Sequence, residues 1–403
     1  MRRFALVSQG LPPSQAGQAM VLYHLLKGFN SADYCLITQK NFQLYHTQGK
    51  HSTWLLARYY FFYPDYQVIR FLIAFASLLH LRFLLNFILK IRVWQIKKIL
   101  KREAAQAVIA CTADLFDPPA AYIASRDLQI PFICYGFDYY SYQGINSVTK
   151  DFAESYEREI ICGAFEIVVP NECMAKEYFD RYSVRSQVIH NPFDLTEYEK
   201  NAALFFGKTD LHEKDRKIKI VYTGSVYEAH YDAFQNLLAA IPLTDVSGLK
   251  LHLYTPQSEL RLHMNAIVGP VVIYKPRPNQ EMAYIQRNAD ILFLPLAFKS
   301  PYPNIIKTSA PGKLGEYLAS KRPILVHAPK DSFISWYFRR FNCGLVVDTD
   351  NPKELAQAIK RLVNDKELCQ TITQNAYYQA KTDFDVSQAQ KKFSRIVNNL
   401  PML

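Results

Sequence analysis

Short buried-strand patterns that alternate with helical patterns constrain the fold of this chain more than any other feature of its sequence. The patterns form two series, separated by a polar, charged stretch that ends near Lys217. Strands with a helix between them pair in parallel, because a parallel connection needs a crossover long enough to cover a sheet face. We therefore expect two doubly wound, Rossmann-like α/β domains that face a cleft. The expected strands span residues 4–7, 34–38, 107–111, 131–135, 166–169 and 187–190 in the first series, and 219–222, 249–254, 271–274, 291–294, 324–327 and 344–347 in the second.

The two series divide the chain into three parts. A length of 403 residues suits two domains, since single cores stop growing at about 250–300 residues. We expect an N-terminal domain over residues 1–200 and a C-terminal domain over residues 216–385. The pattern at 386–403 is a helix that no strand follows, and we expect it to pack back on the N-terminal domain.

The N-terminus and the cysteines both indicate a cytoplasmic protein. The apolar run that begins at Phe4 stops at Gln9, and no small-residue cleavage site follows, so we interpret it as a buried strand and not as a signal peptide. The seven cysteines are an odd number, and none has CxxC spacing. This pattern predicts reduced thiols, with neither a zinc framework nor disulfides.

Positive charge is concentrated in one segment. Lys and Arg total 47 against 36 acids, yet residues 67–102 contain no acid at all. Because most of the excess is local, we expect no nucleic-acid-binding surface spread over the protein. The basic residues of the segment are Arg70, Arg82, Lys90, Arg92, Lys97, Lys98, Lys101 and Arg102.

The same segment carries two apolar runs, 71–81 and 83–89, which Arg82 separates. A transmembrane helix needs about 20 apolar residues, and an Arg near its middle costs several kcal/mol, so we expect no membrane span. A helix that lies in the interface of an anionic membrane explains both the apolar and the basic residues. One or two internal helices with a basic outer face are the alternative.

Residues 307–326 read as a loop, a short helix and a buried strand with very short connections. Pro311 and Gly312 break any preceding regular structure. The loop leaves amide N–H groups pointing outward with Lys313 close to them, an arrangement that suits a pyrophosphate. Glu316, one turn further on, is placed to accept hydrogen bonds from the vicinal hydroxyls of a ribose. An ordinary βαβ crossover with a solvated Lys and Glu is the alternative.

Five motifs in a fixed order connect this segment to the rest of the chain. They are Pro12-Pro13…Gly17, His190-Asn191-Pro192-Phe193-Asp194, Tyr222-Thr223-Gly224-Ser225, Asn288-Ala289-Asp290…Pro295 and Pro311…Lys313…Glu316. In this order and at this spacing the chain resembles glycosyltransferase family 4, a group of retaining enzymes with the two-domain GT-B fold. The Pro-x-Lys before a single Glu is similar to one branch of that family.

The resemblance implies that a sugar is transferred with retention from a nucleotide-sugar donor. It also implies that the second domain holds the nucleotide, that the first holds the acceptor, and that no metal or other cofactor is needed. The only Asp-x-Asp pair that suggests a metal site is Asp348-Thr349-Asp350, and we interpret Asp350-Asn351-Pro352 as the cap of the helix that follows.

Two departures from the family pattern concern the donor site. The family often carries two Glu seven residues apart; Glu316 matches the second, but Thr308 stands at the first position. The family also commonly places an Arg and a Lys after Gly224, where they neutralise the departing diphosphate, and this chain has only His230. Charge develops on the leaving diphosphate, so we expect donors there. The candidates are Lys307, His230, Lys313 and the amides of the loop around Thr308, Ser309 and Gly312.

The remaining candidate site residues are proposed from their positions in the chain. Gly17 lies where the family lets a glycine loop approach the donor or acceptor. Asp138 follows a buried strand at its carboxyl end and can orient or deprotonate an acceptor hydroxyl; capping of its own loop or pairing with an Arg is the alternative. Arg277 lies where the base-contacting loop of the family falls, and Gly224 with Ser225 opens the second domain.

These features together predict a cytoplasmic glycosyltransferase that is peripherally associated with the inner face of a cell membrane. Its predicted partners are a nucleotide-sugar donor, a saccharide or lipid-linked acceptor and an anionic membrane surface over residues 67–102. Its expected role is the synthesis of a surface polysaccharide or glycolipid. Two alternatives remain from the sequence: a degenerate GT-B subunit that only binds, and another GT-B enzyme such as an epimerase.

Overall fold

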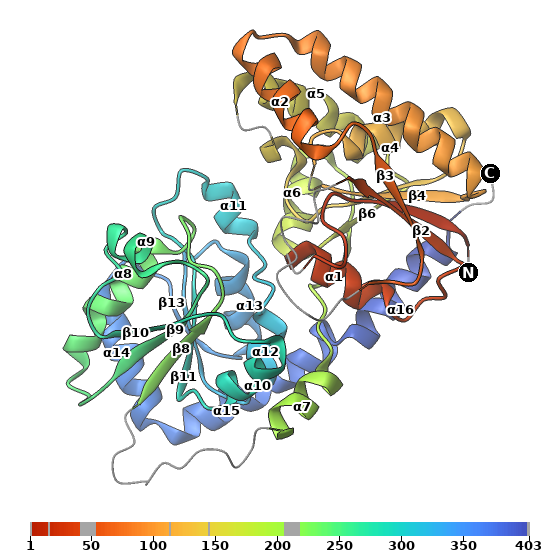
Figure 1. Ribbon diagram of the computed structural model, residues 1–403. Helices are drawn as coiled ribbons and strands as arrows, with labels where there is room; N and C mark the ends of the chain where they lie inside the picture. Colours follow the sequence, from red (N-terminus) through yellow and green to blue (C-terminus); the bar gives the residue numbers. More distant parts are fainter. Residues whose placement is uncertain are drawn as a thin grey trace. The chain divides into compact units, whose positions relative to one another are not determined.

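The computed structural model describes residues 2–14, 17–40, 54–112, 114–143, 146–204 and 218–400 (Figure 1). The chain forms two compact units. Unit 1 comprises Met1–Pro192 together with Val386–Leu403, and unit 2 comprises Phe193–Asp385. Each unit is an α/β layer structure with its own sheet and hydrophobic core.

Unit 1 is built on a seven-stranded parallel sheet in the order β3-β2-β1-β4-β5-β6-β7. The central strands are buried on both faces, as expected for continuous apolar runs in a sheet that helices cover on both sides. The order reverses between β1 and β4, which makes their carboxyl ends a topological switch point. The strands are β1 Phe4–Val7, β2 Tyr34–Gln39, β3 Arg58–Phe62, β4 Ala107–Cys111, β5 Phe132–Tyr135, β6 Glu166–Val169 and β7 Gln187–Val188.

Helices cover the two faces of this sheet in two separate groups. One core joins the sheet to α1 and α16, where Phe393 makes edge contacts with the rings of Phe4 and Phe29. The other core joins the opposite face to α2–α6. In α6, the Asn171 side chain accepts the Met174 N–H and caps the helix. The helices are α1 Gly17–Leu26, α2 Tyr66–Leu78, α3 Arg82–Arg102, α4 Asp117–Leu128, α5 Ser147–Gly163, α6 Glu172–Tyr182 and α16 Val386–Asn398, with a 3₁₀ turn at Tyr140–Gln143.

Unit 2 repeats the same strand order in a six-stranded parallel sheet, β10-β9-β8-β11-β12-β13. Its switch point lies between β8 and β11. The strands are β8 Lys219–Thr223, β9 Lys250–Tyr254, β10 Val271–Tyr274, β11 Ile291–Pro295, β12 Ile324–His327 and β13 Leu345–Val347. The prediction of two doubly wound parallel-sheet domains is confirmed.

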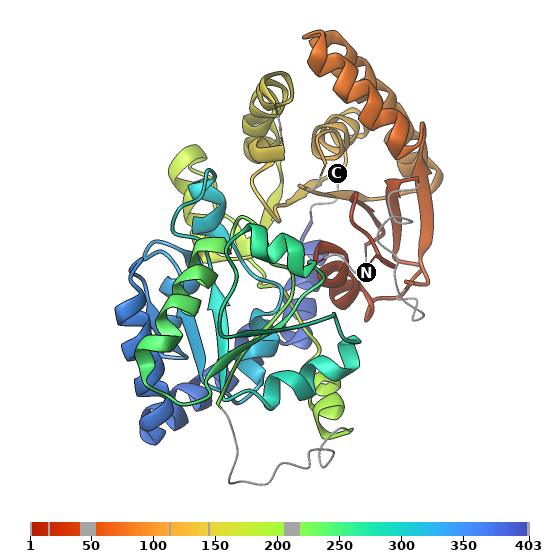
Figure 2. The same cartoon turned by 60° about the vertical axis from the view of Figure 1, so that its left-hand side comes forward.

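The helices of unit 2 include several short ones on the connections of the sheet (Figure 2). They are α7 Leu195–Leu204, α8 Tyr231–Ala240, α9 Glu259–Met264, α10 Asn279–Arg287, α11 Pro303–Thr308, α12 Leu314–Ala319, α13 Phe333–Phe341, α14 Pro352–Asn364 and α15 Lys366–Gln379, with a 3₁₀ turn at Ile241–Thr244 and a π turn at Ala380–Phe384.

The sequence patterns missed five of these helices and strands. Strand β3 lies at the sheet edge and two of its five residues are exposed, so its sequence lacks the buried alternation used to find strands. Helices α9, α11 and α13 have nine residues or fewer, and the sequence patterns predict no helix there. Helix α7 occupies the start of the polar, charged stretch that separates the two series; the rest of that stretch, residues 205–217, lies outside the described residues.

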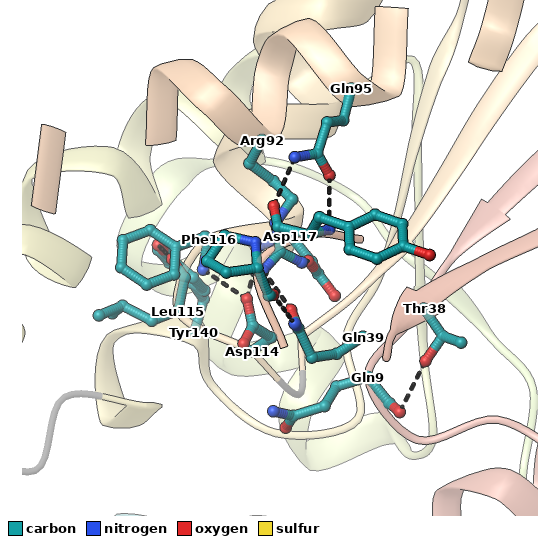
Figure 3. A network of polar contacts seen from close by, with 12 residues as sticks. Gln9, Thr38, Gln39, Arg92, Gln95, Asp114, Leu115, Phe116, Asp117 and Tyr140 are labelled. Carbon is teal, nitrogen blue, oxygen red and sulfur yellow. Dashed lines mark hydrogen bonds and ion pairs between the residues drawn. The ribbon is translucent and has the colours of Figure 1, made fainter. Parts of the chain in front are cut away.

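Arg92 differs from the interpretation of the basic segment as an exposed, positively charged surface. It lies on α3 but is 3% exposed and points inward, where its Nη1 pairs with Asp117 Oδ1 at 2.7 Å (Figure 3). Its Nη2 donates to Gln39 Oε1 at 2.5 Å, and its guanidinium covers the ring of Phe62 at 3.8 Å from the centroid. Arg92 therefore joins α3 to the sheet and to α4, and it adds no charge to the outer surface.

Replacing Arg92 by Ala should destabilise unit 1 strongly, because it leaves the Asp117 carboxylate buried without its cation. Removing one member of a buried pair costs about 3–5 kcal/mol. Lys90→Ala, on an exposed position of the same helix, should change the free energy of unfolding by less than about 0.5 kcal/mol. Denaturant unfolding of the two variants compares them directly. Equal effects would show that the Arg92–Asp117 pair does not anchor α3.

Candidate functional site

The loop after β8 lies at the switch point of unit 2 and is shaped around a glycine. Gly224 has a φ of +131°, a conformation that side-chain-bearing residues rarely adopt. A Cβ at this position would also lie 2.8 Å from Nζ of Lys313. The Gly224 N–H donates to the Tyr254 carbonyl, and the Tyr222 hydroxyl donates to the Ser225 carbonyl at 2.8 Å, so the loop is held on both sides. Glycine is thus required here by the backbone and by the close approach of a cation.

Lys313 precedes α12 and reaches across to β8. Its Nζ lies 3.6 Å from the centroid of the Tyr222 ring, which is fully buried. The ring face favours a cation, but burial dominates and lowers the pKa of Lys313 to about 7, with Glu316 opposing the shift. Near neutral pH the amine therefore exchanges readily between its charged and neutral forms. An anionic ligand at this point would favour the ammonium.

His230 lies beside this lysine at the start of α8 and is 6% exposed. Its ring makes edge contacts with Tyr222 and Tyr227. Burial, and secondly the charge of Lys313, lowers the pKa of His230 to about 3. The imidazole is therefore neutral at pH 7. It can donate one N–H to a ligand but supplies no positive charge.

Glu316 projects from α12 and is held by a residue that the sequence analysis missed. The Nε2 of Gln286, on α10, donates to Glu316 Oε2 at 2.8 Å. Burial raises the pKa of Glu316, while the Gln286 hydrogen bond and the charge of Lys313 lower it. Gln286 is fully buried, and its Oε1 accepts from the Tyr198 hydroxyl at 2.8 Å. The sequence gives no reason to select Gln286, which lies on an amphipathic helix, or Tyr198, which is one of 27 tyrosines.

The other predicted residues of unit 2 lie on nearby connections. Lys307 is half-buried in the last turn of α11, and the buried Thr308 donates its hydroxyl to the Asn304 carbonyl. Ser309 ends α11, and Gly312 is exposed with open space around it. Arg277 is exposed on the loop after β10. The structure therefore brings together Gly224, Ser225, His230, Lys313 and Glu316.

Two predicted residues belong to unit 1. Gly17 begins α1, where it is exposed and has no atom within 4 Å of the position of a Cβ; residues 15–16 before it lie outside the described residues. Asp138 is exposed on the loop that follows β5. Thr112 holds this loop, since its Oγ1 donates to the Asp138 carbonyl at 2.7 Å and accepts the Phe137 N–H at 3.0 Å. The Asp138 carboxylate is thus presented at the carboxyl end of a central strand.

The Asp348-Thr349-Asp350 motif is engaged in structural contacts. Asp348 pairs with Arg339 at 2.7 Å, and Asp350 pairs with Lys299 at 2.8 Å and accepts from Asn236. The cap of α14 is Asn351, whose side chain accepts the Lys353 N–H.

A second surface feature lies on α2 and α3, which follow each other in unit 1 (Figure 1). Large apolar side chains point into solvent along both helices, and the rings of Phe71 and Phe75 stack 6.4 Å apart. Among the described residues, no helix is long and apolar enough to cross a membrane. The exposed apolar residues are Val68, Phe71, Phe75, Leu78, Leu79, Phe83, Phe87 and Trp94, and the exposed basic residues are Arg70, Arg82, Lys90, Lys98, Lys101 and Arg102.

Comparison with known proteins finds one family match within unit 2 and solved structures of similar fold. Residues 217–365 match the family described as Glycosyl transferases group 1. HepE (Alr3699) of Anabaena, solved with UDP, is 14% identical, with a TM-score of 0.68 over 99% of this chain and 100% of that chain. A glycosyltransferase from Rickettsia africae is 12% identical, with a TM-score of 0.66 over 98% of this chain and 97% of that one. Sucrose-phosphate synthase of Thermosynechococcus elongatus is 14% identical, with a TM-score of 0.63 over 99% and 98%. A search of curated protein sequences finds no match.

At these identities the solved structures show the fold, and that fold is GT-B. The family match covers the part of unit 2 that contains Gly224, His230, Lys313 and Glu316. The protein is a glycosyltransferase with the GT-B fold, and its enzymatic class is therefore the one expected from the sequence.

Proposed function

We propose that this glycosyltransferase moves a sugar, with retention, from a nucleotide-sugar donor to a lipid-linked or saccharide acceptor in surface polysaccharide or glycolipid synthesis. The observation that carries the donor assignment is the gathering of Gly224, Lys313 and Glu316 at the switch point of unit 2. Support also comes from HepE of Anabaena, a protein of the same fold whose solved structures contain UDP and UDP-glucose.

Each of these residues has a distinct role in the proposal. The bond between the anomeric carbon and the diphosphate oxygen breaks, and negative charge grows on the departing diphosphate. Lys313 meets this charge in a partly desolvated place, where a cation is worth more than in water. Glu316 accepts hydrogen bonds from the ribose hydroxyls, and Gly224 leaves room for the phosphates. His230 contributes at most one neutral N–H donor.

For the acceptor we assign Asp138, which orients the attacking hydroxyl or takes its proton. The new bond joins that oxygen to the anomeric carbon. We propose that no metal takes part, since Lys313 supplies the positive charge and the carboxylates of Asp348 and Asp350 already pair with Arg339 and Lys299.

Turnover tests the proposal directly. The purified protein is incubated with a panel of nucleotide sugars, with and without a lipid-linked saccharide, and release of nucleoside diphosphate is measured. Acceptor-dependent release from one donor, with the anomeric configuration retained in the product, is the expected result. A product of inverted configuration, or an epimerised nucleotide sugar without transfer, would contradict it.

Lys313→Ala should act on the chemical step. Because the ammonium meets charge that develops mainly in the transition state, kcat should fall by about 10²–10³, more than KM rises. Lys307→Ala, on the neighbouring helix α11, is the matched control and should have a much smaller effect. Steady-state kinetics at saturating donor distinguish the two. A change in KM alone for Lys313→Ala would mean that this residue only helps to bind the donor. A large loss of kcat in Lys307→Ala but not in Lys313→Ala would mean that Lys307, and not Lys313, stabilises the leaving diphosphate.

The affinity for UDP-glucose should depend on pH through Lys313. The pKa of this amine in the free protein is about 7, and a bound diphosphate raises it, so the protonated form binds better. Affinity should therefore be full below pH 7 and weaken as pH rises above 7, by up to about tenfold per unit. The diphosphate of UDP-glucose keeps a constant charge in this range, and His230 titrates far below it. Calorimetry between pH 6 and 9 should show this slope in the wild type and a flat profile in Lys313→Ala; a flat wild-type profile would contradict the assignment.

We propose further that α2 and α3 bring the enzyme to an anionic membrane. The support is the coincidence of exposed apolar side chains with six exposed basic residues and no acid on the two helices. Each Lys or Arg near an anionic surface contributes about 1 kcal/mol, and the apolar side chains enter the interface independently of charge. Two residues of the basic segment do not take part: Arg92 is buried, and Lys97 pairs with Asp127 at 2.7 Å.

Vesicle sedimentation tests this surface. Binding to vesicles with anionic lipid should exceed binding to neutral vesicles and should weaken, without vanishing, at high salt. A triple change of Lys98, Lys101 and Arg102 to Gln should reduce the salt-sensitive part, and Phe71→Ser with Phe83→Ser should reduce the salt-resistant part. Phe179→Ser, an exposed phenylalanine on α6, is the control. Failure of the wild type to sediment with anionic vesicles at low salt would leave α2 and α3 as helices with a basic face.

A further inference from the structure

A chain of buried hydrogen bonds runs behind the candidate donor site of unit 2. The Tyr198 hydroxyl on α7 donates to Oε1 of Gln286 on α10, and Nε2 of Gln286 donates to Oε2 of Glu316 on α12. The same Nε2 lies 3.4 Å from Oγ1 of Thr223 at the end of β8. Gln286 is fully buried and Tyr198 is 6% exposed. Three helices and the central strand thus meet at one amide.

The direction of these bonds fixes the orientation of the amide. A side-chain amide has a donor end and an acceptor end, and an ionised carboxylate only accepts. The NH₂ end of Gln286 therefore faces the Glu316 carboxylate, and its Oε1 accepts from the Tyr198 hydroxyl. If the amide turned over, its oxygen would oppose the carboxylate oxygen. Tyr198 is held in its own place by the ring of Phe193, 6.0 Å away in an edge contact.

Packing fixes the helix that carries the carboxylate. A Cβ at Gly315 would lie 2.5 Å from the Phe193 ring and 3.1 Å from Cβ of Phe384, so α12 is pressed against both side chains. The position of α12 and the rotamer of Glu316 are therefore set by separate contacts, the first apolar and the second polar. Only the second involves Gln286.

We propose that Gln286, oriented by Tyr198, is a positioning residue that holds Oε2 of Glu316 so that Oε1 is directed at the ribose hydroxyls of the nucleotide. This inference rests on the proposed donor role of Glu316. The Gln286 hydrogen bond would hold the Glu316 side chain in its binding rotamer before the nucleotide binds, so that no conformational freedom of this side chain is lost on binding.

The test compares UDP with 2′,3′-dideoxy-UDP by calorimetry at several pH values. The ratio of the two affinities reports the ribose contact alone, because Lys313 and the phosphates act equally on both ligands. In Gln286→Met, which keeps the side-chain length but removes the amide, the ratio should fall about tenfold, the equivalent of one hydrogen bond to a charged group. Tyr198→Phe should lower the ratio less, since the amide is present but free to turn.

The pH dependence of the ratio separates positioning from a general loss of structure. The groups that face Glu316 are Gln286 and Lys313, with the Tyr198 and Tyr317 hydroxyls nearby. The Gln286 N–H favours the ionised carboxylate, so its removal should move the loss of ribose preference on acidification to higher pH. Thermal unfolding of each variant shows whether it is folded, and Tyr198→Phe carries the test if Gln286→Met unfolds.

The outcomes distinguish the inference from the function on which it rests. If Glu316→Gln abolishes the preference for UDP while both Gln286→Met and Tyr198→Phe keep the wild-type ratio and pH midpoint, the positioning role is overturned and the ribose role of Glu316 stands. If Glu316→Gln itself keeps the preference, both are overturned. A reduced ratio with a raised midpoint in Gln286→Met establishes the positioning role.

Discussion

The burial of the Lys313 amine against the face of Tyr222 is the interaction on which the candidate site depends. Removal of water from an ammonium is costly, and the ring face and the nearby Glu316 offset only part of that cost, so the pKa of Lys313 falls to about 7. Its surroundings follow from this placement. Gly224 has no side chain that would meet the Lys313 amine, and His230 stays neutral because it is buried and, secondly, because a second charge beside Lys313 is unfavourable. The charge of an anionic ligand would compensate for the lost hydration.

The strand order explains why these groups meet. In unit 2 the order reverses beside β8, so the loop after β8 and the connection between β11 and β12 emerge at the same edge of the sheet. Lys313 and Glu316 lie on the second, and Gly224 and Ser225 on the first. Gln286 and Tyr198 then fix the carboxylate from behind, through hydrogen bonds that join α7, α10 and α12.

The fold was predictable from the sequence because alternating apolar runs and helical patterns leave few arrangements other than parallel sheets. Most expected strands lie within one or two residues of those observed, and the missed β3 lies at an edge where burial is incomplete. Arg92 shows the limit of a linear pattern, which counts a charge but does not reveal that the side chain turns inward to Asp117. Gln286 is recognisable only from the contact of α10 with α12, because nothing in its local sequence differs from an ordinary helix. The proposed roles of Gly224, Lys313 and Glu316 remain predictions.

A crystal structure of the protein with bound UDP would locate the nucleotide relative to these residues. We expect the diphosphate to lie within hydrogen-bond distance of Lys313 Nζ and over Gly224. The ribose hydroxyls should bond to Oε1 of Glu316, while Oε2 keeps the amide of Gln286. A nucleotide bound elsewhere, or one whose diphosphate contacts neither Lys313 nor the loop after β8, would contradict the account.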